Sequence, residues 1–428
     1  MRHIYTLLLY LLFPLVLLRL LWRSFKAPAY RRRWRERLGL FEHKPAAGGV
    51  WLHAVSVGEV QAIEPLVRHL QKAHPGVPIT ITTTTPTGSD RVGLLFSASV
   101  FHVYCPYDIP RCIDNFLERV RPGVLLLVET EIWPNLLTIC QQRRIPSLLA
   151  NGRMSEKSAL AYRRLGSFTR QVFQRIDRLA VQSGDDARRF AELGVPAQRI
   201  SVTGSIKFDM KIPASVLEQT QVLRRLCGED RPVWVAASTH EGEDEKVLEA
   251  HRMILQQLPT ALLILVPRHP ERFERVTALA RRLEFAVTTR SSGASCDTSI
   301  SVLVGDSMGE LPIFIGTSDV AFIGGSLVPT GGHNMLEAAA QGVAVVFGPH
   351  VFNFPAIARL LLAEQAAVQV SNSEELAQQI LGWLKDASER SRYGENGRRV
   401  VEQNRGAMGN LIKLLEQMLR RQVAGRVE

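Results

Sequence analysis

The chain has 428 residues, 46% of them hydrophobic and 22% charged, which suits two globular domains and excludes a disordered protein. The net charge is +11, but residues 1–37 hold nine Lys or Arg and one acidic residue. A nucleic-acid-binding protein would carry its basic residues over a folded face, so we expect no nucleic-acid partner. The five cysteines are odd in number and widely spaced, which argues against a disulfide framework and favours a reducing compartment.

The first predicted element is an apolar N-terminal helix. Residues 4–18 carry no charge, and the apolar run continues to residue 22 before a basic cluster that ends at residue 37. A cleaved signal peptide carries its positive charge before the apolar run, so this order predicts a retained anchor, with the remaining chain in the cytoplasm. Anionic membrane lipids are the expected partner. Because the run is short and contains Pro14, both a spanning helix and an interfacial helix stay open.

Short apolar runs then alternate with helical stretches, one of which has Val60, Ile63, Val67 and Leu70 on one face. The pattern restarts after a polar stretch near residues 209–231. Continuous apolar strands separated by helices predict an α/β protein with two parallel sheets in two Rossmann-like domains. The predicted strands are residues 50–55, 79–84, 100–105, 124–128, 147–150, 179–182 and 200–203, then 233–237, 262–266, 285–289, 302–304, 320–323 and 343–347.

Three loops at predicted strand ends have Glu three residues after Ser or Asn, at 56–59, 307–310 and 334–337. Each fits a capping box, in which the Glu reaches back to the helix start. Each also fits a ligand site, because a helix start offers N–H groups and partial positive charge to a phosphate. The glycine-rich stretch 324–334 predicts a phosphate or nucleotide cradle, although it matches neither a P-loop nor a dinucleotide fingerprint. In such folds the cleft between two sheets is the expected site.

Single residues at other strand ends allow two interpretations each. Arg268 is either a phosphate ligand or a surface arginine in a turn, and Lys207 is either functional or a solvated lysine. His53, beside an apolar strand, is interpreted as structural rather than catalytic. No metal-binding motif is evident, so we expect no metal.

Together these motifs resemble those of the 3-deoxy-D-manno-octulosonic acid (Kdo) transferases of lipopolysaccharide assembly. The resemblance runs nearly from end to end of the chain, and the motifs are specific as a set although each is modest alone. They are KAPAYR (26–31), HAVSVGE (53–59), TPTGS (85–89), ETEIWPN (129–135), TGSIKFD (203–209), PRHPERF (267–273), MGE (308–310), GGHN (331–334), GPH (348–350) and FNF (352–354).

The resemblance implies a GT-B type glycosyltransferase with an N-terminal membrane-anchoring helix. It assigns residues 1–25 to the anchor, 26–210 to an acceptor-binding domain and 211–428 to a CMP-sugar-binding domain. It implies inverting transfer of Kdo from CMP-Kdo to the lipid A disaccharide precursor (lipid IVA), without a cofactor. The expected location is the cytoplasmic side of the bacterial inner membrane.

The resemblance also implies residue roles. Glu59 matches the general base of the family, and Glu129 and Lys207 match residues that stabilise the transition state. The family commonly has Pro where this chain has Met335, and Pro at a first helical turn only preorganises the helix. The residues that match the CMP-binding segments are Pro267, Arg268, Met308, Gly309, Glu310, Asn334, Met335, Leu336 and Glu337.

Three alternatives remain open at the level of the sequence. Another transferase of the same fold would use a UDP-sugar, and binding of CMP rather than UDP would distinguish the two. A nucleotide-sugar epimerase is possible because the fold also hosts that chemistry, and it would need no lipid acceptor. A basic membrane scaffold would explain residues 1–37 but not the glycine-rich loop or the paired α/β halves.

Overall fold

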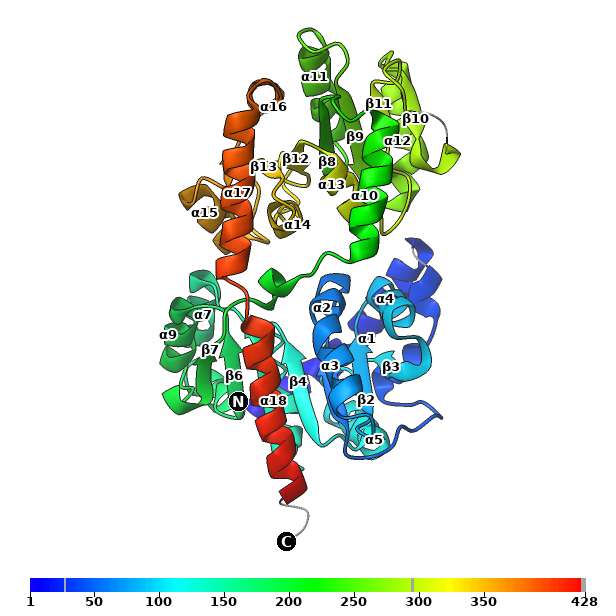
Figure 1. Cartoon of the computed structure of the whole chain (residues 1–428). Helices are drawn as coiled ribbons and strands as arrows, with labels where there is room; N and C mark the ends of the chain where they lie inside the picture. The colour runs from blue at the N-terminus through cyan, green and yellow to red at the C-terminus, as the bar shows by residue number, and fades with distance from the viewer. Residues whose placement is uncertain (27, 294–295, 425–428) are drawn as a thin grey trace. The chain divides into compact units, whose positions relative to one another are not determined.

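The computed structural model describes residues 1–26, 28–293 and 296–424 (Figure 1). The chain forms two compact units, one made of Met1–Asp209 with Arg405–Glu428 and the other of Met210–Asn404. Ala27 of the basic motif and residues 425–428 of the expected second domain lie outside the described residues. Each unit contains its own parallel sheet, so the predicted fold class is confirmed.

The first unit contains a seven-stranded parallel sheet in the order β3-β2-β1-β4-β5-β6-β7. Val50 of β1 pairs with Ile79 on one side and with Val124 on the other. The strand order reverses between β1 and β4, and open α/β sheets bind ligands at the carboxyl ends of strands at such a point. The strands are β1 (Val50–His53), β2 (Ile79–Thr83), β3 (Phe101–Tyr104), β4 (Val124–Val128), β5 (Ser147–Gly152), β6 (Arg178–Val181) and β7 (Ile200–Val202).

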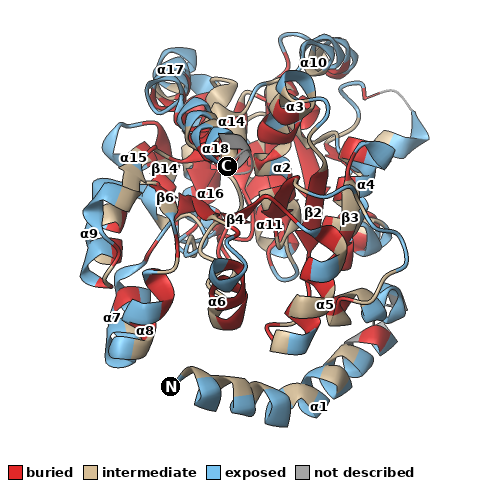
Figure 2. Cartoon of the chain, turned by 90° about the horizontal axis from the view of Figure 1, so that it is seen from below, coloured by how far each residue is buried: buried red, intermediate tan, exposed pale blue. Residues whose placement is uncertain are grey.

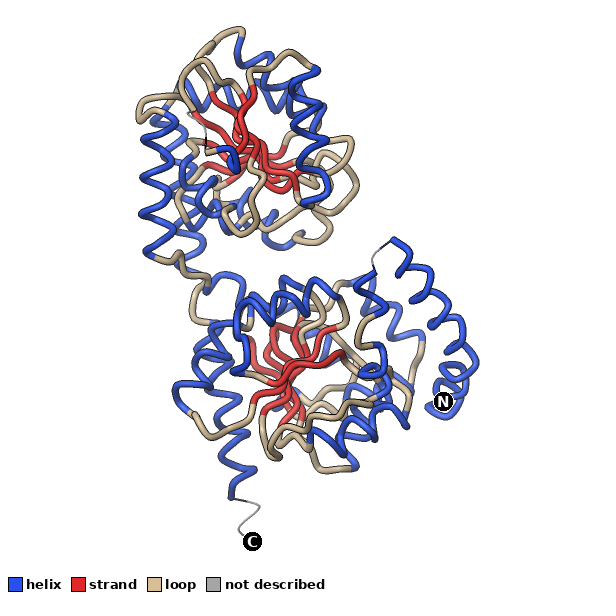
Figure 3. The backbone as a smooth tube through the Cα atoms, turned by 90° about the vertical axis from the view of Figure 1, so that its right-hand side faces the viewer, coloured by secondary structure: helices blue, strands red, loops and turns tan. Residues whose placement is uncertain are grey.

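Helices enclose this sheet (Figure 3). Leu52 of β1 belongs to one buried cluster with Leu66 of α3, whereas the adjacent Trp51 packs against Phe116 of α5 with ring centroids 4.4 Å apart. Successive residues point to opposite faces, so burial on both faces requires continuous apolar strands. The helices are α2 (Val57–Ala62), α3 (Glu64–Ala73), α4 (Pro86–Phe96), α5 (Pro110–Val120), α6 (Pro134–Gln142), α7 (Glu156–Arg164), α8 (Ser167–Phe173) and α9 (Gly184–Glu192), with short 3-10 helices η1 (Pro28–Arg31), η2 (Trp34–Leu38), η3 (Ser97–Ser99), η4 (Ala197–Arg199) and η5 (Ile206–Asp209).

Helix α1 (Arg2–Lys26) lies on the outside of the first unit, where it contacts α6 (Figure 2). The Tyr5 hydroxyl donates to the Asp108 carboxylate at 2.9 Å. The outward side of the helix exposes large apolar side chains, including Trp22 at 63%. Residues Arg2–Trp22 have a mean hydropathy of 2.2, so this helix is long and apolar enough to cross a membrane.

The basic cluster that follows α1 is divided between the surface and the interior. Arg31, Arg32 and Arg35 are exposed. Arg37 is buried, donates to the Thr84 carbonyl at 2.8 Å and stacks over the Tyr104 ring. Arg37 therefore supports the fold, and the exposed members of the cluster remain available to a membrane surface.

The second unit repeats the architecture, with a parallel sheet in the order β10-β11-β9-β8-β12-β13-β14. The switch point here lies between β8 and β12. The strands are β8 (Val233–Thr239), β9 (Leu262–Pro267), β10 (Val287–Thr289), β11 (Val302–Val304), β12 (Val320–Ile323), β13 (Ala344–Phe347) and β14 (Ala367–Gln369); β14 is not among the predicted strands. The helices are α10 (Ala214–Cys227), α11 (Asp244–Leu255), α12 (Phe273–Arg282), α13 (Leu311–Thr317), α14 (Leu336–Ala340), α15 (Pro355–Ala363), α16 (Ser373–Lys385) and α17 (Ala387–Gln403), with η6 (Pro270–Arg272) and η7 (Arg290–Ser292).

The last helix, α18 (Ala407–Ala424), returns to the first unit. Its apolar residues Leu411 and Leu415 are buried in the same cluster as Leu66. The Asp209 carboxylate accepts the backbone N–H groups of Gly406 and Met408, each at 2.6 Å, and so caps the helix start. The expected second domain, residues 211–428, is therefore too long: residues from Arg405 onward belong to the first unit.

Candidate active site

Glu59 lies in the first turn of α2, which follows the interior strand β1. Its Oε2 accepts the Val55 N–H at 2.7 Å, and its Oε1 accepts the Ser56 hydroxyl at 2.8 Å. Ser56 in turn caps the helix by accepting the Glu59 N–H. Ser56 therefore caps the helix as predicted, but the Glu59 carboxylate reaches back to the N–H of Val55 rather than to that of Ser56. These bonds hold the carboxylate in one orientation at the carboxyl ends of the strands.

The environment of Glu59 brings its pKa close to neutrality. Burial raises this pKa from 4.5 to about 7, against the opposing effect of the hydrogen bonds from Val55 and Ser56. The negative charges of Glu129 and Glu131 add to the rise. A carboxylate with a pKa near the working pH combines a usable unprotonated fraction with adequate basicity, which is what a general base requires.

Glu129 and Lys207 form an ion pair at the same edge of the sheet. Glu129 follows β4, and its Oε1 lies 2.7 Å from the Lys207 Nζ, which η5 carries after β7. The Glu129 backbone has φ 58°, a left-handed conformation that costs a residue with a Cβ about 1 kcal/mol or more. Lys207 therefore has a specific partner, and is not the solvated lysine that the sequence also allowed.

Glu131 and His53 also lie at this edge of the sheet. Burial raises the pKa of Glu131, and its Oε2 accepts the indole N–H of Trp133 at 2.9 Å. His53 is fully buried, its Nδ1 lies 2.9 Å from the Thr82 hydroxyl, and burial lowers its pKa to about 4. A neutral, enclosed His53 agrees with the structural role expected for it. Glu131 was not among the predicted site residues, although it stands in the same ETEIWPN motif as Glu129.

In the second unit, Pro267 ends β9 and Arg268 follows it. The Arg268 N–H donates to the Thr239 carbonyl at 3.0 Å, which ties the end of β9 to that of β8. The guanidinium charge of Arg268 depresses the pKa values of His240 and His333, although burial is the larger cause for both. The loops that follow β8 and β12 therefore bring His240 and His333 near Arg268.

The segment from Met308 to Glu310 is held by its glutamate. Glu310 pairs with Arg290 at 2.8 Å and also accepts the Ser307 hydroxyl. The pKa of Glu310 is lowered, chiefly by Arg290, so this carboxylate is ionised and engaged. Gly309 has φ 87°, and Met308 is 65% exposed. These two residues offer a turn of accessible backbone with an apolar side chain beside it.

The segment from Asn334 to Glu337 begins α14. Asn334 Oδ1 accepts the Leu336 N–H at 3.2 Å, and its Nδ2 donates to Glu337 Oε1 at 3.3 Å. Burial raises the pKa of Glu337. Met335 and Leu336 are fully buried, so neither side chain is exposed to a ligand, and the Leu336 N–H is already engaged by Asn334.

The glycine-rich loop differs from the predicted cradle. The N–H groups of Gly325, Ser326 and Leu327 donate to the Glu243 carboxylate at 2.6, 3.0 and 2.9 Å. These three donors are therefore engaged with a buried side chain, and the expectation that this stretch of the loop cradles a phosphate is wrong. The sequence reasoning missed Glu243; its only local signal is the position after β8, in Thr-His-Glu-Gly-Glu.

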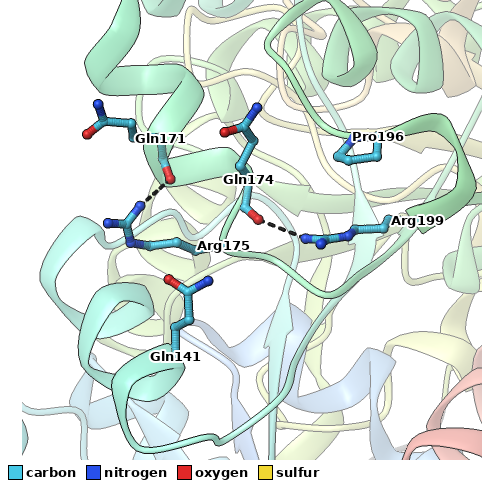
Figure 4. A pocket seen from close by; sticks show the side chains of 6 residues that line it. All are labelled: Gln141, Gln171, Gln174, Arg175, Pro196 and Arg199. Atoms are coloured by element: carbon cyan, nitrogen blue, oxygen red, sulfur yellow. Dashed lines mark hydrogen bonds between the residues drawn. The ribbon is translucent and has the colours of Figure 1, made fainter.

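A shallow cavity of about 320 Å³ lies elsewhere in the first unit (Figure 4). It lies near the amino ends of the strands, since Arg199 immediately precedes β7, whereas Glu59 and Glu129 follow strand carboxyl ends. Arg199 donates to the Gln174 carbonyl at 2.8 Å, and Arg175 donates to that of Gln171. These side chains brace the loops, so the strand carboxyl ends remain the candidate site. Within the described ranges, no group of three or more His, Cys, Asp or Glu is placed to hold a metal.

Comparisons with known proteins identify the family of the chain. A family model described as 3-Deoxy-D-manno-octulosonic-acid transferase (kdotransferase) matches residues 32–210, and one described as Glycosyl transferases group 1 matches residues 290–400. A 3-deoxy-D-manno-octulosonic acid transferase of Haemophilus influenzae is 43% identical, covering 99% of this chain and 100% of the relative. The transferase of the same name from Bordetella pertussis is 35% identical, covering 98% and 99%.

The fold itself is shared more widely. A solved UDP-GlcNAc 2-epimerase from Neisseria meningitidis, bound to UDP-GlcNAc, matches with a TM-score of 0.56 at 13% identity, over 86% of this chain and all of that chain. Likeness at this identity concerns the fold alone, so it does not favour the epimerase alternative. The full-length identity decides the matter: the chain belongs to the 3-deoxy-D-manno-octulosonic acid transferase family, glycosyltransferases of lipopolysaccharide biosynthesis with the GT-B fold.

Proposed function

We propose that this protein transfers Kdo from CMP-Kdo to a sugar hydroxyl of the lipid A disaccharide precursor, with Glu59 as general base. The observation that carries the assignment of the base is the Glu59 carboxylate, held by Val55 and Ser56 with a pKa of about 7. A carboxylate with an ordinary pKa would be a much weaker base towards a sugar hydroxyl. We assign acceptor binding to the first unit and CMP binding to the second.

The reaction is a single displacement with inversion. The acceptor oxygen forms a bond to the anomeric carbon of Kdo, and Glu59 takes the hydroxyl proton. The bond between that carbon and the phosphate oxygen breaks, and its electron pair leaves with CMP. The sugar develops oxocarbenium character in between, as in glycoside hydrolysis.

The Glu129–Lys207 pair serves the transition state in this proposal. The Glu129 carboxylate offsets the positive charge that develops on the sugar, and Lys207, 2.7 Å away, fixes its orientation. The left-handed backbone at Glu129 supports a functional role, since strained backbone concentrates at active sites.

We assign recognition of the CMP group to three segments of the second unit. Arg268 supplies a planar guanidinium to the phosphate. The turn at Gly309 lets the nucleotide approach the backbone closely, and the Arg290–Glu310 pair holds that turn in place. The start of α14 at Asn334 completes the set.

Helix α1 supports attachment to the cytoplasmic face of the inner membrane in this proposal. Its exposed apolar side suits the bilayer, and the exposed Arg31, Arg32 and Arg35 suit anionic head groups. A lipid acceptor would keep its acyl chains in that bilayer while its sugar head enters the protein.

The direct test is to incubate the purified protein with CMP-Kdo and the lipid A precursor and to weigh the product by mass spectrometry. We expect a mass increase of one or more Kdo residues, and binding of CMP in preference to UDP. Turnover of a UDP-sugar with no reaction of CMP-Kdo would overturn the proposed donor.

A further inference from the structure

Glu243 is a buried carboxylate that neither the mechanism nor the sequence motifs use. It lies between β8 and α11 and is fully enclosed. Its Oε2 accepts the N–H groups of Gly325 at 2.6 Å and His240 at 3.2 Å, and its Oε1 accepts those of Ser326 at 3.0 Å and Leu327 at 2.9 Å. An ionised carboxylate has about four lone-pair sites and no donor, so four N–H groups match it fully.

The glycine-rich loop is built to pack on this carboxylate. A Cβ at Gly324 would lie 2.9 Å from Glu243 Oε2 and 2.8 Å from the Ser238 carbonyl oxygen, which leaves no room for a side chain. Gly325 has φ 67°, the left-handed conformation that glycine adopts without strain. Burial raises the pKa of Glu243, and the N–H groups that it accepts oppose this rise.

A second contact, between His240 and His333, holds the far end of the same loop. The Nε2 atoms of His240 and His333 lie 2.8 Å apart, and their ring planes differ by 7°. This in-plane contact needs one protonated and one bare nitrogen, which neutral imidazoles provide. Burial lowers the pKa of His240 to about 4 and that of His333 to about 3, so both rings are neutral near pH 7.

We propose that Glu243 and His240 are positioning residues for donor binding, which fix both ends of loop 324–333 so that Asn334–Glu337 meets the CMP group in the right place. This inference rests on the proposed function, because that function assigns Asn334–Glu337 to CMP. Glu243 touches no ligand in this scheme; it acts through the loop.

The test is the Glu243→Gln variant of the full-length protein, because a glutamine oxygen accepts fewer N–H groups and its own NH₂ opposes the others. We expect the loop amides to exchange hydrogen at least about tenfold faster, measured by mass spectrometry on the peptide that covers residues 320–335. We expect the Kd for CMP, measured by calorimetry, and the KM for CMP-Kdo to rise about tenfold, with kcat at saturating donor within about twofold of wild type.

Glu375→Gln is the matched control. Glu375 also accepts a backbone N–H at a helix start of the second unit, from Ser371 at 2.8 Å, but Ser371 and Glu375 are exposed and lie outside the loop. This variant should change neither loop exchange nor the Kd for CMP. If Glu243→Gln loses its cooperative thermal transition, the same measurements are made on His240→Ala. That variant removes only the contact between His240 and His333.

The outcomes separate this inference from the proposed function. Faster loop exchange with an unchanged Kd for CMP would overturn the positioning role and leave the proposed function intact. Unchanged exchange would overturn the inference at its first step. A wild-type protein that does not bind CMP would overturn the proposed donor, whatever the exchange data say about the loop.

Discussion

Replacing Glu59 by Gln separates its role as a base from its role as a helix cap. In the wild-type protein the Val55 N–H lies 2.7 Å from Glu59 Oε2. The glutamine side chain has the same size and an oxygen that can accept this N–H, but it cannot take a proton. Loss of a general base reduces turnover by roughly 10²- to 10⁴-fold. We therefore expect a folded variant that binds CMP with wild-type affinity and has kcat lowered by that factor.

The raised pKa of Glu59 also makes the stability of the folded protein depend on pH. The pKa is about 7 in the folded protein and 4.5 ordinarily, so between these values the folded state binds more protons than the unfolded state. The free energy of unfolding therefore includes the full contribution of the protonated carboxyl below pH 4.5. This contribution, about 3 kcal/mol, is lost as the pH rises through 7. A neutral glutamine does not incur this loss.

The assay is thermal unfolding of both proteins at pH 5 and pH 8, with turnover measured in parallel. At pH 8 we expect Glu59→Gln to melt several degrees above wild type, since about 1 kcal/mol corresponds to roughly 2–4 °C in a unit of this size. At pH 5 the wild-type carboxyl is protonated and the difference should largely disappear. Retained turnover would refute the base role, and equal melting temperatures at both pH values would refute the burial argument.

Three further predictions concern other parts of the site. Lys207→Ala leaves Glu129 without its ion-pair partner, and we expect kcat to fall about 10- to 100-fold, with Lys207→Arg recovering part of the loss in a steady-state assay; equal activity in both variants and wild type would count against the pair. Arg268→Ala should raise the Kd for CMP about tenfold or more in calorimetry while leaving the melting temperature within about 2 °C, since the side chain is half-exposed. Removing residues 1–25 should reduce activity on bilayer-embedded acceptor more than on detergent-solubilised acceptor, and equal reductions would contradict the role given to α1.

Features that depend on residues close together in the sequence could be predicted without the structure. Ser56 and Glu59 are three residues apart, so the capping pattern is visible in the sequence, and Ser56 accepts the Glu59 N–H as expected. The strands of both sheets were recognised because burial on both faces demands continuous apolar runs. β14 was missed because only Ala367 of its three residues is fully buried, which leaves a weak pattern.

Contacts between residues far apart in the sequence could not be predicted from the sequence. The partner of Lys207 lies 78 positions earlier in the chain and that of Gly325 lies 82 positions earlier, and no local pattern connects either pair. The glycine-rich loop was interpreted as a phosphate cradle because glycine and free N–H groups are its only local features. The structure shows that Glu243 already accepts three of those N–H groups.

The sequence by itself determined two α/β halves, an apolar N-terminal helix, a glutamate at the end of the first strand, and membership of a transferase family. The tertiary structure decided which charges meet at that glutamate, which carboxylate holds the glycine-rich loop, and that α18 belongs to the first unit. The physical reason is that propensity and capping act over a few residues, whereas strand order and burial set contacts and pKa values across the whole fold.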